Sequence, residues 1–161
     1  MINAANQTAS VSNSPVTYTG SAQTVAVTCS GGGTATNITP ASQTAAGSYT
    51  VTADCPATAN YNAGTGLSAG SFVINKAAPT ASITNSPVTY NGSVQTAVVA
   101  CTGGGEATLA SGGTGTNVGS YPAAVNCAAS TNYAAASGLA AGNFVIEAAT
   151  PTASITNTPV T

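Results

Sequence analysis

The sequence predicts an all-β protein, and three observations support this fold class. Short runs rich in Val, Ile, Thr and Tyr alternate apolar and polar positions, and Gly, Asn, Ser and Pro separate these runs. No segment of useful length carries the apolar spacing of an amphipathic helix. The whole succession of strand and turn residues then occurs a second time in the same order, which indicates a duplicated structural unit.

The repeat has a period of 72 residues and needs no insertion or deletion. Ser14–Thr24 (SPVTYTGSAQT) returns as Ser86–Thr96 (SPVTYNGSVQT), 72 positions later, and Phe72 returns as Phe144. A third copy begins within Glu147–Thr161. We therefore expect a β-repeat domain at residues 1–74, a second at 75–146, and the opening strand segment of a third repeat at 147–161.

The first half of each copy is expected to form short strands. In the first copy these are Thr8–Val11 and Val16–Tyr18, with Pro15 between them, because proline cannot donate to a strand ladder. A single strand is expected over Thr24–Cys29, with alternate residues facing inward. The triple glycine Gly31–Gly33 ends this strand.

The second half of each copy contains the firmest predicted strand. Thr34–Ala46 is irregular and differs most from its counterpart Ala107–Val118, which predicts a surface loop or a weak edge strand. A strand is then expected over Ser48–Cys55, with every second residue from Tyr49 facing the core, and the closing strand over Ser71–Asn75. The next copy follows almost at once, so the linkers are short and favour a stiff array.

The composition excludes several classes of partner. The chain has one Lys or Arg, three Asp or Glu and a formal net charge of −2. This balance provides no basic track for nucleic acid and no polybasic contact with anionic lipid. No apolar run approaches the roughly 18 residues of a membrane-spanning helix. Disorder is disfavoured, because it normally accompanies high net charge and few β-branched residues.

Two cysteines recur at equivalent positions of each copy: Cys29, Cys55, Cys101 and Cys127. Three pairings are possible in principle, and the repetition favours Cys29–Cys55 with Cys101–Cys127, since each domain then has its own disulfide. A metal site is a poor alternative, because the chain has no CxxC motif and no histidine. Disulfides indicate an oxidising compartment, so we expect an extracellular or cell-surface location.

No catalytic, cofactor-binding or metal-binding constellation is recognisable. The chain has no histidine, and Asp54, Glu106 and Glu147 each correspond to an uncharged residue in the other full copy. The glycine runs lack the lysine and the following helix of a phosphate-binding loop, so a turn is the simpler interpretation. We therefore expect a protein that is not an enzyme and needs no cofactor.

The order of motifs resembles the MBG-type and related bacterial immunoglobulin-like tandem repeats of large secreted and cell-surface proteins. The motifs of the first copy that carry the resemblance are Tyr18-x-Gly20-x-x-Gln23, Ala46–Val51, Ala59–Asn62 and Gly70–Ile74. The resemblance implies β-rich modules that serve as stalks, spacers or adhesive shafts. It implies two tandem small immunoglobulin-like β-sandwich domains as the first choice of fold, with a β-grasp-like sheet as the second.

Two functions are compatible with these features. The first is a structural repeat of an extracellular shaft or filament, stiffened by disulfides and packing against like chains, because uncharged strand edges suit such packing. The second is an adhesin module that recognises a glycan or a host protein through the variable loops Thr34–Ala46 and Ala107–Val118. Against the adhesin, no cluster of Trp, Tyr or Arg offers an anchor.

The last segment is a candidate inter-subunit strand. Its residues Thr152, Ala153, Ser154, Ile155 and Thr156 repeat an opening strand without the domain that should follow. Such a strand is expected to pair with a neighbouring subunit, as donor strands do. The alternative is that the segment belongs to a longer array from which this chain is cut.

Overall fold

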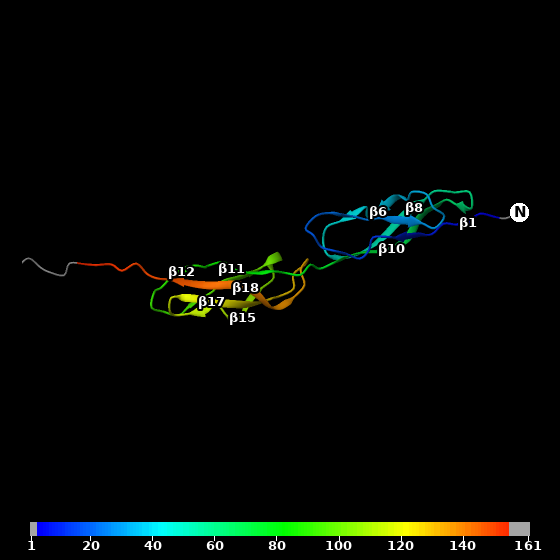
Figure 1. Cartoon of the computed structure of the whole chain (residues 1–161). Coiled ribbons are helices and arrows are strands. Elements are labelled where there is room, and N and C mark those ends of the chain that lie inside the picture. Colours follow the sequence, from blue (N-terminus) through cyan, green and yellow to red (C-terminus); the bar gives the residue numbers. More distant parts are fainter. Residues whose placement is uncertain (1–2, 155–161) are drawn as a thin grey trace, which may run out of the picture. The chain divides into compact units, whose positions relative to one another are not determined.

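A computed structural model of the chain describes residues 3–154 and is all-β, apart from one short 3-10 turn within those residues (Figure 1). The chain divides into two compact units. Unit 1 takes in the residues up to Pro79 together with Ala129–Ala134, and unit 2 takes in Thr80–Ala128 and the residues from Ala135 onward.

Unit 1 contains the strands of the first copy. In chain order they are β1 (Ala5–Asn6), β2 (Ala9–Val11), β3 (Val16–Thr17), β4 (Gln23–Thr24), β5 (Val27–Cys29), β6 (Thr36–Thr39), β7 (Ser42–Gln43), β8 (Gly47–Cys55), β9 (Tyr61–Asn62) and β10 (Gly64–Asn75). The main sheet has the order β3-β10-β8-β6, with β10 antiparallel to β8 and parallel to β3. The second layer consists of the pairs β2-β5 and β4-β7, and β2 packs across β10 and β8.

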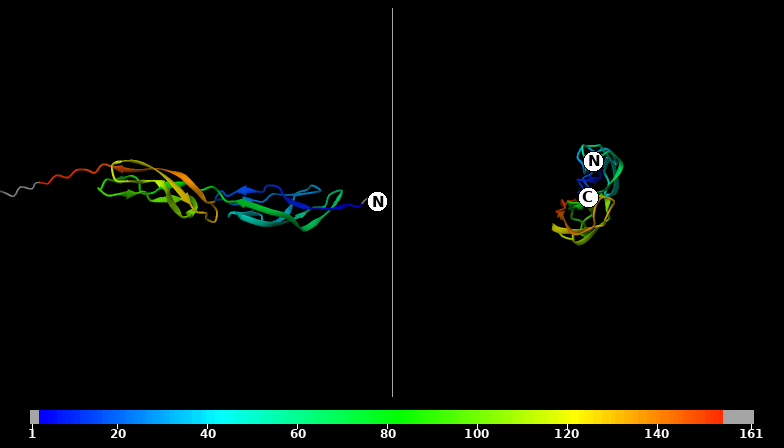
Figure 2. Two further views of the ribbon diagram at one scale, coloured as in Figure 1. Left: turned by 90° about the horizontal axis from the view of Figure 1, so that it is seen from below. Right: turned by 90° about the vertical axis from the view of Figure 1, so that its right-hand side faces the viewer.

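Unit 2 repeats this arrangement. Its strands are β11 (Ala81–Ile83), β12 (Val88–Thr89), β13 (Gln95–Thr96), β14 (Val99–Cys101), β15 (Ala107–Gly112), β16 (Thr114–Gly115), β17 (Gly119–Cys127) and β18 (Ala136–Glu147), with the 3-10 turn η1 (Thr102–Gly104) after β14. The main sheet runs β12-β18-β17-β15, and the second layer contains β11-β14 and β13-β16. Figure 2 shows the strands of unit 2 from two further sides, in green to orange. The predicted tandem of small β-sandwich domains is confirmed.

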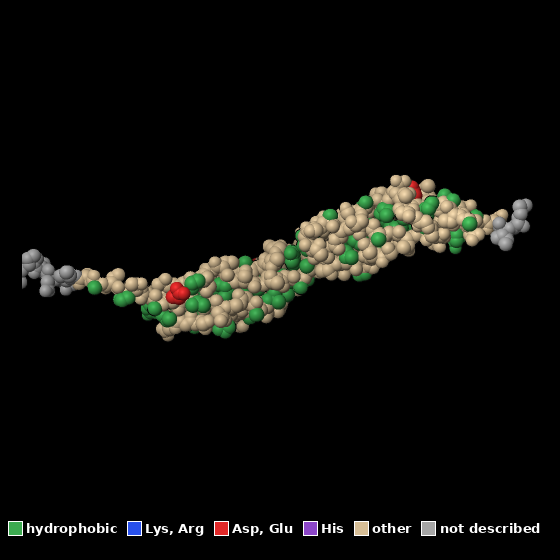
Figure 3. Space-filling view, turned by 45° about the horizontal axis from the view of Figure 1, so that its top comes forward, with side chains coloured by type: hydrophobic (Ala, Val, Ile, Leu, Met, Phe, Trp, Pro, Cys, Tyr) green, Lys and Arg blue, Asp and Glu red, His purple; other side chains and the backbone are tan. Residues whose placement is uncertain are grey.

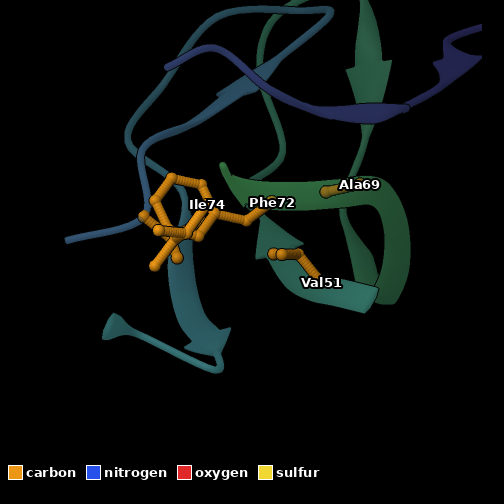
Figure 4. Close-up of a cluster of buried hydrophobic side chains, with 5 residues drawn as sticks. Val51, Ala69, Phe72 and Ile74 are labelled. Carbon is orange, nitrogen blue, oxygen red and sulfur yellow. The ribbon is translucent and has the colours of Figure 1, made fainter. Parts of the chain in front are cut away.

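The core of unit 1 lies on the inner face of β8 and β10. Val51 and Phe72 are fully buried, and Ile74 and Val25 are 2% exposed. Figure 4 shows Val51 on β8 and Ala69, Phe72 and Ile74 on β10. Burial alternates along β8 as predicted, since every second residue from Tyr49 to Cys55 is the more buried one. The sequence pattern thus assigns the inward face of the central strand correctly.

The expected single strand Thr24–Cys29 is wrong, because the chain changes partner in its middle. β4 pairs with β7 and β5 pairs with β2. Between them, the Asn13 side chain donates to Thr24 O at 2.8 Å and accepts from the Ala26 N–H at 3.0 Å. The Asn13 amide therefore supplies the backbone bonds that the interrupted ladder would have made.

The closing strand is longer than expected. β10 begins at Gly64, whereas the sequence predicts a strand only from Ser71. Gly66 and Gly70 lie within β10, and their positive φ values of 60° and 88° accommodate irregularities in the pairing with β8. Glycine adopts this conformation without the steric cost of a Cβ atom, so here it marks bulges within a strand.

The Tyr-x-Gly-x-x-Gln motif closes the turn after β3. Gly20 has a φ of 86°, which allows the tight reversal. The Gln23 side chain donates to Thr17 O at 2.9 Å, and the equivalent Gln95 donates to Thr89 O at 3.0 Å. The motif therefore has a structural role in both units.

A serine hydroxyl connects the start of β3 to the closing strand. The Val73 N–H donates to Ser14 Oγ at 2.8 Å in unit 1, and the Val145 N–H donates to Ser86 Oγ at 2.9 Å in unit 2. Val73 is half-buried, so loss of this acceptor leaves an amide that water reaches only in part.

We expect Ser14→Ala to lower the free energy of unfolding of unit 1 by about 1–2 kcal/mol, because the Val73 N–H loses its partner. Ser14→Thr is the matched control, since it keeps a hydroxyl at this position. Urea unfolding resolved by residue-level NMR signals measures both. Equal losses in the two variants would contradict the role of the hydroxyl.

Candidate functional site

The four predicted cysteines form two disulfides, each within one unit. Cys29 on β5 is joined to Cys55 at the end of β8, and Cys101 on β14 is joined to Cys127 on β17. The Cα–Cα distance is 5.8 Å in both bonds, which is typical of a disulfide. Each bond connects the small layer of its sandwich to the main sheet, so it opposes separation of the two layers.

The acidic residue Asp54 on β8 connects the two strands beside it, β6 and β10. Its carboxylate accepts from the Asn37 side chain and from the Gly66 N–H, both at 2.6 Å. These bonds, the one from Asn37 foremost, lower the pKa of Asp54 below its ordinary value of 3.8. In unit 2, Asn126 takes the equivalent place and accepts from the Gly138 N–H at 2.9 Å. An amide thus substitutes for the carboxylate, which indicates a structural role.

A second acidic residue, Glu106, lies at a shallow hollow on the surface of unit 2. Glu106 lines it together with Thr108, Asn126 and Ser137. The hollow has a single carboxylate and no imidazole or amine to act with it. Within residues 3–154, no group of three or more His, Cys, Asp or Glu side chains is arranged to hold a metal ion. This arrangement offers no recognisable acid–base pair.

The two variable loops form edges of the main sheets. Thr34–Ala46 contains the edge strand β6 and the short strand β7, and Ala107–Val118 contains β15 and β16. Of the two predicted alternatives, a surface loop or a weak edge strand, an edge strand is present in both units. β15 pairs with β17 at five positions with one irregularity, whereas β6 pairs with β8 at two positions with one irregularity between them.

Large apolar side chains are exposed on unit 2 at positions that the sequence analysis did not single out. They are Tyr90, Val94, Val98 and Val118, with exposed fractions of 40%, 67%, 56% and 56%. In the first copy the corresponding positions hold Tyr18, Ala22, Ala26 and Ala46. Comparison of the copies would have shown three alanines replaced by valine, and this is a usable signal for an exposed apolar surface.

In unit 1, the equivalents of Tyr90 and Val118 are Tyr18 and Ala46. A turn of the second copy within Ala129–Ala134, which belongs to unit 1, covers these two residues. The Tyr133 ring lies edge-on to Tyr18, with ring centroids 5.6 Å apart and planes at 75°. Beside it, Asn132 Oδ1 accepts a hydrogen bond from the Ala46 N–H at 2.9 Å. Tyr18 and Ala46 are consequently half-buried.

The candidate inter-subunit strand is described only in part. Thr152, Ala153 and Ser154 are exposed and are not assigned to a strand. Ile155 and Thr156 lie outside the described residues.

Comparison of the chain with protein-family models, with curated proteins and with solved structures finds no match. In the described part of the chain, no helix is both long enough and apolar enough to cross a membrane.

We expect the Cys29→Ala/Cys55→Ala double variant to lose about 3–4 kcal/mol of unfolding free energy in unit 1, because the open loop gains conformational entropy when unfolded. Cys101→Ala/Cys127→Ala is the matched control and should produce the same loss in unit 2. Hydrogen exchange read for each unit measures both. A loss shared equally by the two units in either variant would show that the disulfides do not act locally.

Asp54 makes the stability of unit 1 depend on pH. Because its folded pKa is lowered, its contribution is complete above the ordinary pKa of 3.8 and disappears as the pH falls through the folded pKa. Asp54→Asn should flatten this acid-dependent loss and keep the bond from Gly66, as Asn126 does in unit 2. An acid titration of the stability of unit 1 tests this, and an unchanged profile in the variant would contradict it.

Proposed function

We propose that the chain is a structural repeat segment of an extracellular shaft or filament that packs against like chains. The observation that carries this proposal is that each unit is a complete sandwich with its own core and its own cross-layer disulfide. Such modules can be joined in tandem, because each has its own core and its own disulfide. The resemblance to bacterial immunoglobulin-like surface repeats favours the same role.

The surface supports packing against like chains. On the face drawn in Figure 3, acidic side chains occur only in small isolated places among uncharged atoms of the described residues. Proteins that must stay apart usually protect their strand edges with charge. A surface with so few charges provides little electrostatic repulsion between copies of the chain.

An extracellular or cell-surface location belongs to the same proposal. Both disulfides join sequence-distant strands of small domains, as is typical of proteins in oxidising compartments. The hydrogen-bonding roles of Asp54 and of the motif glutamines account for these polar residues without catalysis. The proposed role is therefore structural and not enzymatic.

The segment Thr152–Thr156 has a role in the shaft as a strand that pairs with the next subunit. Its support is the repeated opening-strand sequence, whose counterpart in unit 2 forms β11. Deletion of Thr150–Thr161 should weaken assembly, and unchanged assembly after the deletion would remove this part of the proposal.

Electron microscopy of the non-reduced protein tests the proposed function. Regular fibres with an axial repeat of one or two domains are the expected result. The control is the protein with all four cysteines changed to alanine, which should give fewer and less regular fibres because its domains unfold more readily. Dispersed particles at all protein concentrations and salt concentrations would overturn the assembly role.

A further inference from the structure

The covered surface of unit 1 has an uncovered equivalent on unit 2. Tyr18 and Ala46 correspond to Tyr90 and Val118, which are 40% and 56% exposed. We call Tyr90 and Val118 the tyrosine surface. In unit 1 the equivalent residues receive Tyr133 and Asn132, so the structure itself shows what such a surface binds.

The backbone beneath the two surfaces is held in the same way. The Tyr18 N–H donates to Asn75 O at 2.9 Å, and the Tyr90 N–H donates to Glu147 O at 2.8 Å. Next to the other residue, the hydroxyl of Tyr49 donates to Ala45 O at 2.8 Å, and that of Tyr121 donates to Asn117 O at the same distance. The tyrosine surface of unit 2 therefore has the support that its covered counterpart has.

The matching turn is present in the first copy. Asn60 and Tyr61 are the equivalents of Asn132 and Tyr133. Both turns contain the same backbone bond, from Thr58 N–H to Tyr61 O in one and from Ser130 N–H to Tyr133 O in the other, each at 3.0 Å. Asn60 is exposed, whereas Asn132 is half-buried within unit 1. We call Asn60 and Tyr61 the Asn-Tyr turn.

We propose that the tyrosine surface of one chain binds the Asn-Tyr turn of a second copy of the chain. The Tyr61 ring would meet Tyr90 edge-on, and Asn60 Oδ1 would accept from the Val118 N–H, as Tyr133 and Asn132 do within unit 1. This inference rests on the proposed self-association and names the contact that produces it. The two surfaces differ, so the contact is heterologous and leaves one of each free for further chains.

The chemistry of the contact predicts how it responds to salt. The four residues of the turn and the surface are uncharged. Association through them should therefore change little with ionic strength, unlike a contact between charged groups, which salt screens. This property separates the proposed contact from association through the few charged side chains.

Sedimentation equilibrium of the full chain, with the weight-average mass followed over concentration, tests the contact. We expect the wild-type mass to rise with concentration. Tyr90→Glu and Asn60→Glu should each raise the dissociation constant by roughly tenfold or more, because each places a charge in the centre of the contact. Val98→Glu is the matched control, because Val98 has the same exposed fraction as Val118 but lies outside the surface, and it should leave association unchanged.

Mixing the two blocked variants provides a sharper test. Tyr90→Glu keeps its Asn-Tyr turn and Asn60→Glu keeps its tyrosine surface, so an equimolar mixture should form dimers that neither variant forms alone. As a second readout, the Val118 amide signal of the wild type should shift with concentration, while that of Ala46, already bonded to Asn132, should not.

The outcomes separate this inference from the broader proposal. If the wild type assembles and neither Tyr90→Glu nor Asn60→Glu weakens assembly more than Val98→Glu, this contact is wrong and the shaft proposal stands. If the wild type remains monomeric at all concentrations, both fail. Failure of the mixture to dimerise, with both variants folded and the wild type associating, also overturns the contact.

Discussion

The cross-layer disulfide is the constraint on which each sandwich depends. The fully buried side chains are few: in unit 1 the largest are Phe72 and Ile74 on one strand and Val51 on the next. A core of this size stabilises a small domain only marginally. Because Cys29–Cys55 fixes β5 of the second layer to β8 of the main sheet, the layers remain in register around a core that would hold them weakly by itself.

Side-chain amides and hydroxyls replace charge in holding the chain together. Asn13 bonds to the backbone at the break between β4 and β5, and Gln23 bonds to the backbone across the turn after β3. Ser14 accepts a hydrogen bond from the backbone of the closing strand. Each of these bonds joins a side chain to the backbone, where it satisfies a group that the short strands leave unpaired. This accounts for a folded protein with so few charged residues, since ion pairs on an exposed surface would contribute little.

The sequence predicted the features that depend on local pattern. The alternation along β8, the all-β class and the two disulfide pairs follow from residue spacing and from the repeat. It missed features that depend on tertiary partners. The break after Thr24 requires Asn13, which lies outside the strand pattern, and Gly66 and Gly70 lie within a strand because bulges, and not turns, use their positive φ. The exposure of Tyr90 likewise depends on which residues cover it, whereas its equivalent Tyr18 is covered.

Asn13, Ser14 and Gln23 share one property: each lies in the same copy as the backbone group that it bonds. Ser14 reaches Val73 and Ser86 reaches Val145, from the start of one copy to its end and no farther. A 72-residue copy could therefore be gained or lost as a whole without breaking these bonds within a copy, whereas the bond from the Ala46 N–H to Asn132 joins one copy to the next. The length of such an array can change in steps of one domain while the folding of every remaining domain is preserved.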